Sequence, residues 1–296
     1  MDPNNIRSKS ILIMLLTLFS CTDKEDVKEN DTYYSEWTVI GDGLSTNVTK
    51  NVLTEFVGST KCPYCPASDS LLLSYFNTVH ENYVGSNIAS NWFLINYHTY
   101  SPSRGDPMYE FLRGESETGD DDFCYVRFEE GGWYTISGVP ITFTNGFYSS
   151  ISAEMAIPYM SESTPIQMSL EGTTFDSLTI TIELYLNSSK DLSNSDSLRL
   201  FIAAKIDDVD YEGYNGEPHH QDVFLGWIND GLSGESLSLK NEEVVRNYTW
   251  EMPGNWPQNN YETSWWKVEW DVANLAVVAF IQNKYTKEIL QVIGTD

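Results

Sequence analysis

The clearest sign of chemistry in the sequence is a pair of cysteines, Cys62 and Cys65, with two residues between them. An apolar run over residues 51–57 predicts a strand before the pair, and helical spacing over residues 66–76 predicts a helix after it. Unpaired N–H groups and the macrodipole at a helix N-terminus stabilise an anion such as a thiolate. We therefore expect Cys62, next to Lys61, to be the attacking thiolate and Cys65 to resolve the mixed disulfide.

Two other interpretations of this cysteine pair remain open. A zinc site needs a second pair of ligands, but Cys124 has no partner cysteine and the four histidines show no matching spacing. A purely structural disulfide between Cys62 and Cys65 would close a very short loop and would stabilise the fold little. The sequence therefore favours redox chemistry, and we expect neither a bound metal nor a cofactor.

Two further motifs look partly like metal ligands. Residues 208–213 begin like a calcium-binding loop, but His219 occupies the position where the bidentate glutamate is needed. His219 and His220 are neighbours in an expected strand, so their side chains point to opposite faces of the sheet. Neither motif predicts a metal site.

The N-terminus predicts export. Arg7 and Lys9 precede an apolar run over residues 11–19, which is too short to cross a bilayer as a helix but typical of a secretory signal. The run ends in Leu-Phe-Ser-Cys, which resembles a lipobox, so we expect cleavage after residue 20 and a lipid on Cys21. The alternative is an ordinary signal peptide with an accidental cysteine. The polar residues after Cys21 predict a flexible tether over residues 21–45.

Composition restricts the class of partner. The 296-residue chain has a formal net charge of −26, and so acidic a surface repels phosphate backbones. Nucleic acid is therefore not an expected partner. Four cysteines are too few for a disulfide framework in a chain of this size, which leaves one working pair.

The pattern of apolar residues divides the chain after residue 162. Residues 46–162 alternate between strand-like and helix-like segments, and residues 163–296 contain strands separated by turns. The fold class predicted is an α/β domain followed by an all-β, sandwich-like C-terminal domain. Besides the segments beside the cysteines, we expect strands over residues 92–98, 140–144, 178–186, 198–206, 275–282 and 288–292, a turn at Asn145-Gly146, and a helix over residues 151–160.

Two segments of the first domain resemble a known superfamily. Residues 52–56 leading into Cys-Pro-Tyr-Cys look like the thioredoxin superfamily, and residues 137–141 resemble its cis-proline loop. The resemblance implies a thioredoxin-like α/β domain in which a cis Val139–Pro140 bond faces the cysteines. It also implies that Pro63, Tyr64 and the backbone of Val139 contact the substrate. The alternative is an ordinary loop proline at Pro140.

The resemblance also gives Glu55 a role. This residue stands where the superfamily often has a buried acid beneath the second cysteine. A carboxyl group buried in an apolar strand holds a proton more readily, so Glu55 could accept the proton of Cys65. The alternative is a glutamate at a strand end that faces water.

The whole layout resembles a narrower group, the Omp-twenty-eight-related outer membrane lipoproteins, which implies an outer-membrane location, facing the periplasm or the cell surface. Two functions follow from these patterns. The first is a membrane-anchored thiol–disulfide oxidoreductase whose partners are thiols or disulfides of exported proteins. The second is a surface binding lipoprotein without enzymatic activity.

Overall fold

The computed structural model describes ten segments of the chain. They are residues 33–83, 91–112, 127–128, 132–152, 154–176, 179–193, 196–229, 233–252, 261–262 and 267–295. The predicted signal peptide over residues 1–20, the predicted lipidation at Cys21, and Cys124 lie outside these segments. Within them, no helix is long and apolar enough to cross a membrane.

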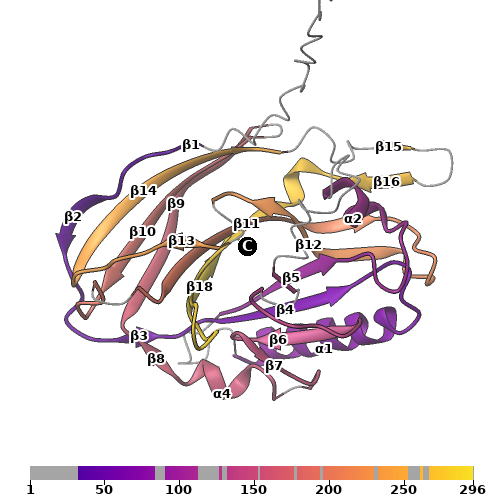
Figure 1. The fold of residues 1–296 in the computed structure, drawn as a ribbon, viewed down its shortest axis with the longest axis horizontal. Helices are drawn as coiled ribbons and strands as arrows, with labels where there is room; N and C mark the ends of the chain where they lie inside the picture. Colours follow the sequence, from indigo (N-terminus) through magenta and orange to yellow (C-terminus); the bar gives the residue numbers. More distant parts are fainter. Residues whose placement is uncertain are drawn as a thin grey trace, which may run out of the picture.

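Strands dominate the described residues (Figure 1). The helices described are α1 (Cys65–Tyr83), α2 (Pro107–Leu112) and α4 (Ile157–Met160), with a short 3-10 helix at Val272–Asn274. The helix predicted over residues 151–160 is thus only four residues long, and it begins beside Pro158, which favours the first turn of a helix. The predicted α/β thioredoxin-like domain is therefore wrong as a fold class, whereas the predicted β-rich C-terminal half is compatible with this structure.

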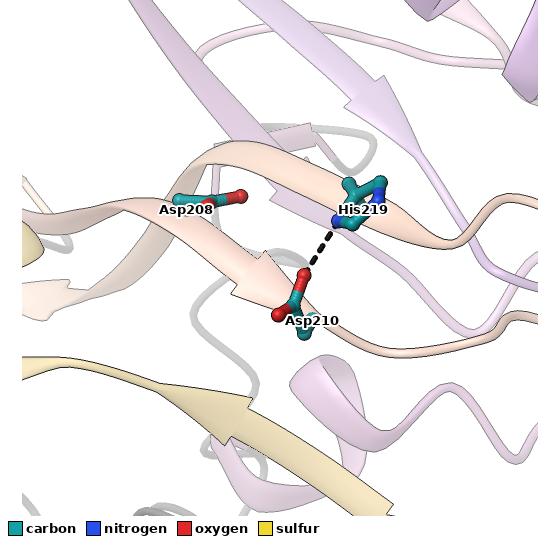
Figure 2. Close-up of side chains that lie close together, drawn as sticks. All are labelled: Asp208, Asp210 and His219. Carbon is teal, nitrogen blue, oxygen red and sulfur yellow. Dashed lines mark hydrogen bonds and ion pairs between the residues drawn. The ribbon is translucent and has the colours of Figure 1, made fainter.

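The larger sheet joins strands from both halves of the sequence. Its main order is β15-β16-β11-β12-β5-β4-β6-β7, while β13 and β17 also pair with β11, and β18 pairs with β17. Strands β4 and β5 run parallel, as do β5 and β12, where Asn96 lies opposite Val223. Strands β11 and β12 are antiparallel, which places Asp210 opposite His219 (Figure 2). The bounds are β4 Val52–Gly58, β5 Trp92–His98, β6 Ile141–Thr144, β7 Phe147–Tyr148, β11 Leu198–Asp210, β12 His219–Trp227, β13 Glu235–Ser236, β15 Tyr261–Glu262, β16 Lys267–Trp270, β17 Leu275–Asn283 and β18 Ile289–Gly294.

The smaller sheet has the order β1-β14-β10-β9, with β2 also on β14. Its strands are β1 Tyr33–Tyr34, β14 Glu242–Glu251, β10 Thr179–Ser188, β9 Ile166–Asp176 and β2 Thr38–Asp42; a separate pair joins β3 Val48–Thr49 to β8 Ser163–Thr164. Residues of β1 and β2 were assigned to the tether from the sequence, but the structure pairs them with β14. The polar stretch of the tether ends before Tyr33, and aromatic and β-branched residues follow.

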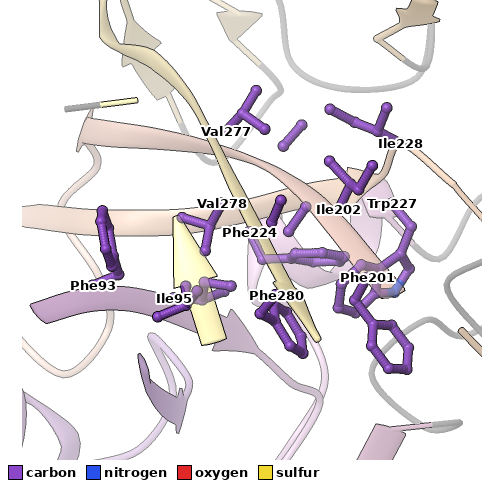
Figure 3. Packing of buried hydrophobic residues seen from close by; sticks show 14 of the residues in the cluster. Phe93, Ile95, Phe201, Ile202, Phe224, Trp227, Ile228, Val277, Val278 and Phe280 are labelled. Atoms are coloured by element: carbon purple, nitrogen blue, oxygen red, sulfur yellow. The ribbon is translucent and has the colours of Figure 1, made fainter. Parts of the chain in front are cut away.

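Two cores explain why the α/β prediction failed. Side chains alternate along β4, so Leu53 and Val57 enter one core while Val52 and Phe56 enter another. The second core contains Leu72 of α1, as an α/β fold requires. The first core is instead filled by strands of both sheets. The larger sheet contributes Ile95, Phe201, Phe224, Trp227 and Phe280 (Figure 3), and the smaller one contributes Ile182 and Tyr248. Strands therefore cover one face of β4 and β5, and α1 packs on the other.

The predicted turn at Asn145-Gly146 is present between β6 and β7. Both residues have positive φ, 48° and 90°, which is the geometry of a tight hairpin turn. A Cβ atom at Gly146 would lie 1.8 Å from the carbonyl oxygen of Lys287. The turn is thus pressed against the hairpin that joins β17 and β18.

We expect Gly146→Ala to lower the free energy of unfolding by more than about 1 kcal/mol, because the new Cβ adds a backbone clash to the cost of a positive φ. Gly216→Ala is the matched control, since Gly216 has φ 84° but open space around it. Urea unfolding followed by tryptophan fluorescence measures both variants. Equal losses would show that the contact with Lys287 is unimportant.

Candidate functional site

Cys62 and Cys65 form a disulfide at the start of α1, directly after the loop that follows β4. Both cysteines are buried, with 1% and 2% of their surface exposed, whereas Tyr64 between them is 74% exposed. Exposure therefore does not distinguish the predicted attacking cysteine, Cys62, from the predicted resolving cysteine, Cys65. Tyr64 is an accessible side chain of this segment, whereas the two cysteines are shielded.

The loop before β6 lies against the first cysteine. The carbonyl oxygen of Val139 lies 3.7 Å from Sγ of Cys62. The peptide bond between Val139 and Pro140 is cis, as the resemblance to the cis-proline loop implied. The structure thus brings together Cys62, Cys65, Val139 and Pro140, which come from separate parts of the sequence.

A loop from the C-terminal half binds the backbone of the cysteine loop. The Nδ2 group of Asn215 donates to the carbonyl oxygens of Ser59 and Cys62, at 3.3 and 3.2 Å, and the backbone N–H of Asn215 donates to the oxygen of Thr60 at 3.1 Å. The ammonium group of Lys61 lies over the ring of Tyr214. Residues that connect β11 to β12 therefore hold the loop that carries the disulfide.

A buried histidine–aspartate pair also binds the backbone of the cysteine loop. Nδ1 of His98 lies 2.8 Å from Oδ2 of Asp106, and this oxygen also accepts from the backbone N–H of Thr60 at 2.8 Å. Burial lowers the pKa of His98, but the charge and hydrogen bond of Asp106, together with the charges of Glu217 and Asp69, raise that pKa above its ordinary value. Burial would raise the pKa of Asp106, but the charge and hydrogen bond of His98 lower it. Both shifts favour the charged forms, so a buried ion pair sits at the C-terminal end of β5.

A second carboxyl group beside the disulfide behaves differently. Asp69 lies one turn beyond Cys65 in α1 and is 7% exposed. Burial, followed by the charge of Glu217 and a hydrogen bond to it, raises the pKa of Asp69 to about 8. Burial and the nearby charge of His98 lower the pKa of His220 to about 3, so His220 is neutral at neutral pH. The site therefore contains a carboxyl group that keeps a proton at neutral pH.

Glu55 lies elsewhere. Its Oε1 atom accepts from Nε of Arg127 at 2.5 Å and from the hydroxyl of Tyr97 at 3.1 Å, and its Oε2 atom accepts from the hydroxyl of Tyr134 at 2.7 Å. Glu55 shares its face of β4 with Leu53, which belongs to the core on the side away from α1. Among the described residues the structure therefore places Glu55 in a buried ion pair rather than beneath Cys65.

Comparison with known proteins gives one informative result. No protein-family model matches the chain, and no curated protein matches its sequence. The fold is similar to that of HBP35 of Porphyromonas gingivalis. The match covers 83% of this chain and 75% of that chain, with a TM-score of 0.60 and 14% identity. At this identity the likeness to HBP35 concerns the fold alone.

The two metal-like motifs of the sequence meet on one face of the larger sheet. Ligand atoms of Asp208, Asp210 and His219 lie within 4.8 Å of one another (Figure 2). All three side chains are exposed, and Nδ1 of His219 contacts Oδ1 of Asp210 at 2.5 Å. Exposed groups of this kind are common in proteins without a bound ion, and the likeness to HBP35 adds no ligand. The cluster alone therefore does not indicate a metal site.

Sequence reasoning missed five residues around the disulfide: Asp69, His98, Asp106, Asn215 and Glu217. A pattern in the sequence could have identified Asp69. Cys65, Asp69, Leu72 and Val79 follow helical spacing, and all four are buried, so Asp69 is a charged residue in an otherwise apolar stripe. The other four depend on contacts between distant segments, which no local spacing reports.

Proposed function

We propose that the chain is an exported thiol–disulfide oxidoreductase that exchanges the Cys62–Cys65 disulfide with thiols or disulfides of exported proteins. The observation that carries this proposal is the placement of the disulfide between the cis Val139–Pro140 loop and a group of buried titratable side chains. A structural disulfide needs neither a proton-holding carboxyl group nor an exposed aromatic ring beside it. Perturbed titratable groups next to a reactive pair are typical of functional sites.

The compartment is part of the same proposal. The short apolar segment and the Leu-Phe-Ser-Cys sequence support cleavage before Cys21 and a lipid on that cysteine. A lipid there would hold the disulfide site at the outer membrane, where its partners would be proteins that have already been exported. Pro63, Tyr64 and the backbone of Val139 would contact such a partner, since Val139 lies against the sulfur atom of Cys62 and the two residues that follow Cys62 are exposed.

Insulin reduction by dithiothreitol tests the activity. We expect residues 21–296 to accelerate the reaction, and we expect a Cys62→Ser, Cys65→Ser double variant not to accelerate it, because the exchange needs both sulfur atoms. Cys124→Ser is the control and should keep the activity. A wild-type chain that shows no acceleration would refute the oxidoreductase proposal and leave the binding lipoprotein as the better explanation.

A further inference from the structure

The acid closest to the resolving cysteine along α1 is Asp69. The side chains of Cys65 and Asp69 are four residues apart, so they are neighbours on one face of α1, about 5–6 Å apart at Cβ. Both are buried, and Leu72 continues the same face. A carboxylate in this position would lose hydration, which favours the protonated form.

The partner of Asp69 comes from the other half of the chain. Glu217 precedes β12 and is hydrogen-bonded to Asp69. Two carboxylates cannot hydrogen-bond to each other, because neither has a donor, so this bond requires one proton between the two groups. An oxygen of Glu217 also accepts from Nδ2 of Asn215, the group that donates to the oxygen of Cys62.

The charged groups around Asp69 and Glu217 come from several elements. His98 of β5 lowers the pKa of Asp69, and Asp222 of β12 raises it. Asp222 is itself paired with Lys205 of β11. Nδ1 of the neutral His220 lies 3.8 Å from Oε2 of Glu217. Asp106 faces His98 and is ionised with it. His98, the cation that lowers the pKa of Asp69, is thus already paired with Asp106, and the two carboxyl groups are left to share a proton.

We infer that Asp69 and Glu217 form a carboxyl pair that exchanges one proton with Cys65 during thiol–disulfide exchange. The inference rests on the proposed function and names the groups that the buried sulfur of Cys65 uses. A buried thiolate at Cys65 would be costly, and the pair removes that cost. Because the pair holds one proton for two carboxyl groups, it can either donate or accept.

A substrate dithiol would reduce the disulfide in two exchange steps. A substrate thiolate attacks Sγ of Cys62, the Cys62–Cys65 bond breaks, and Cys65 leaves with the electron pair and takes the proton of the carboxyl pair. The second substrate thiol loses its proton to water and attacks the substrate sulfur of the mixed disulfide, which releases Cys62 as a thiolate. The substrate is oxidised to a disulfide, the protein is reduced to a dithiol, and water returns the proton to the carboxyl pair.

The experiment follows the opening of the disulfide in the full chain by dithiothreitol, with rates divided by the concentration of the dithiothreitol thiolate. For the wild type we expect this corrected rate to fall as the pH rises through about 8, where the pair loses its proton. Asp69→Asn should be about 100-fold slower at pH 7 and should lose this fall, since general acid catalysis of this kind contributes about that much. Glu217→Gln should move the fall to lower pH, because the charge that raises the pKa of Asp69 is gone.

Glu212→Gln is the matched control, because Glu212 is exposed in the same loop, and its profile should equal that of the wild type. Urea unfolding checks that each variant is folded. If Asp69→Asn does not fold, the carboxyl pair is tested by whether Glu217→Gln moves the fall in the corrected rate to lower pH. A wild-type disulfide that does not react at any pH would overturn the proposed function and the carboxyl pair together. A reactive wild type with unchanged profiles in Asp69→Asn and Glu217→Gln would overturn the carboxyl pair alone.

Discussion

Cys65→Ser should accumulate covalent complexes with thiol proteins of the same compartment, whereas Cys62→Ser should accumulate none. In the first variant Cys62 can still form a mixed disulfide, but the thiol that resolves it is missing. The structure supports this order because Sγ of Cys62 lies at the cis Val139–Pro140 loop, while Cys65 is the first residue of α1, one helical turn before Asp69. Non-reducing gels and mass spectrometry of material isolated from cells would detect the complexes.

The control for trapping is a second substitution, Cys124→Ser, in both variants, because Cys124 could form disulfides of its own. Complexes should persist in the Cys65→Ser, Cys124→Ser variant and should disappear on reduction. If Cys62→Ser and Cys65→Ser trapped equal amounts, the assignment of Cys62 as the attacking sulfur would be refuted.

Glu55→Ala should cause a large loss of stability. The substitution leaves the guanidinium of Arg127 buried without its carboxylate and removes the acceptor of the Tyr97 and Tyr134 hydroxyls. The paired state is strongly favoured, since burial would lower the pKa of Arg127, yet Glu55 raises it above its ordinary value. Breaking a buried ion pair on one side costs about 3–5 kcal/mol, and we expect a loss of this size in urea unfolding.

Glu162→Ala is the matched control for the buried pair. Glu162 also pairs with a buried cation, Lys50, but Glu162 is half exposed and Lys50 keeps a second partner in Glu288. We expect a loss of less than about 1 kcal/mol there. If Glu55→Ala is too unstable to purify, Glu55→Gln can replace it, because glutamine keeps one acceptor oxygen. Its loss of unfolding free energy should lie between those expected for Glu55→Ala and Glu162→Ala. Equal losses in Glu55→Ala and Glu162→Ala would show that the pair contributes little.

Local patterns predicted local structure well. The strand predicted over residues 92–98 has the bounds of β5, the strand over residues 275–282 is one residue shorter than β17, and the turn at Asn145-Gly146 is present. Each of these depends on neighbouring residues, such as an apolar run or an asparagine–glycine pair. The cysteine pair could be found for the same reason, since its chemistry follows from a loop and the helix after it.

The contacts between distant segments could not be predicted. The apolar run of β4 indicated burial on both faces, but not that a helix covers one face and strands of the other half cover the second. Glu55 illustrates the consequence, because its partner Arg127 is 72 residues away and fixes which face the carboxylate occupies. Asn215 reaches the oxygen of Cys62 across 153 residues. No periodicity in a single sequence reports such pairings.

The parallel pairing of β5 with β12 also determines when the disulfide site can be completed during folding. The cysteines leave the ribosome well before residues 215–227, which provide Asn215 and β12. Pairings between segments so far apart form slowly, because the intervening chain must close a large loop first. During that interval the thiols of Cys62 and Cys65 lack the loop that later holds their backbone, so oxidants around the nascent chain can reach both cysteines before the folded protein shields them.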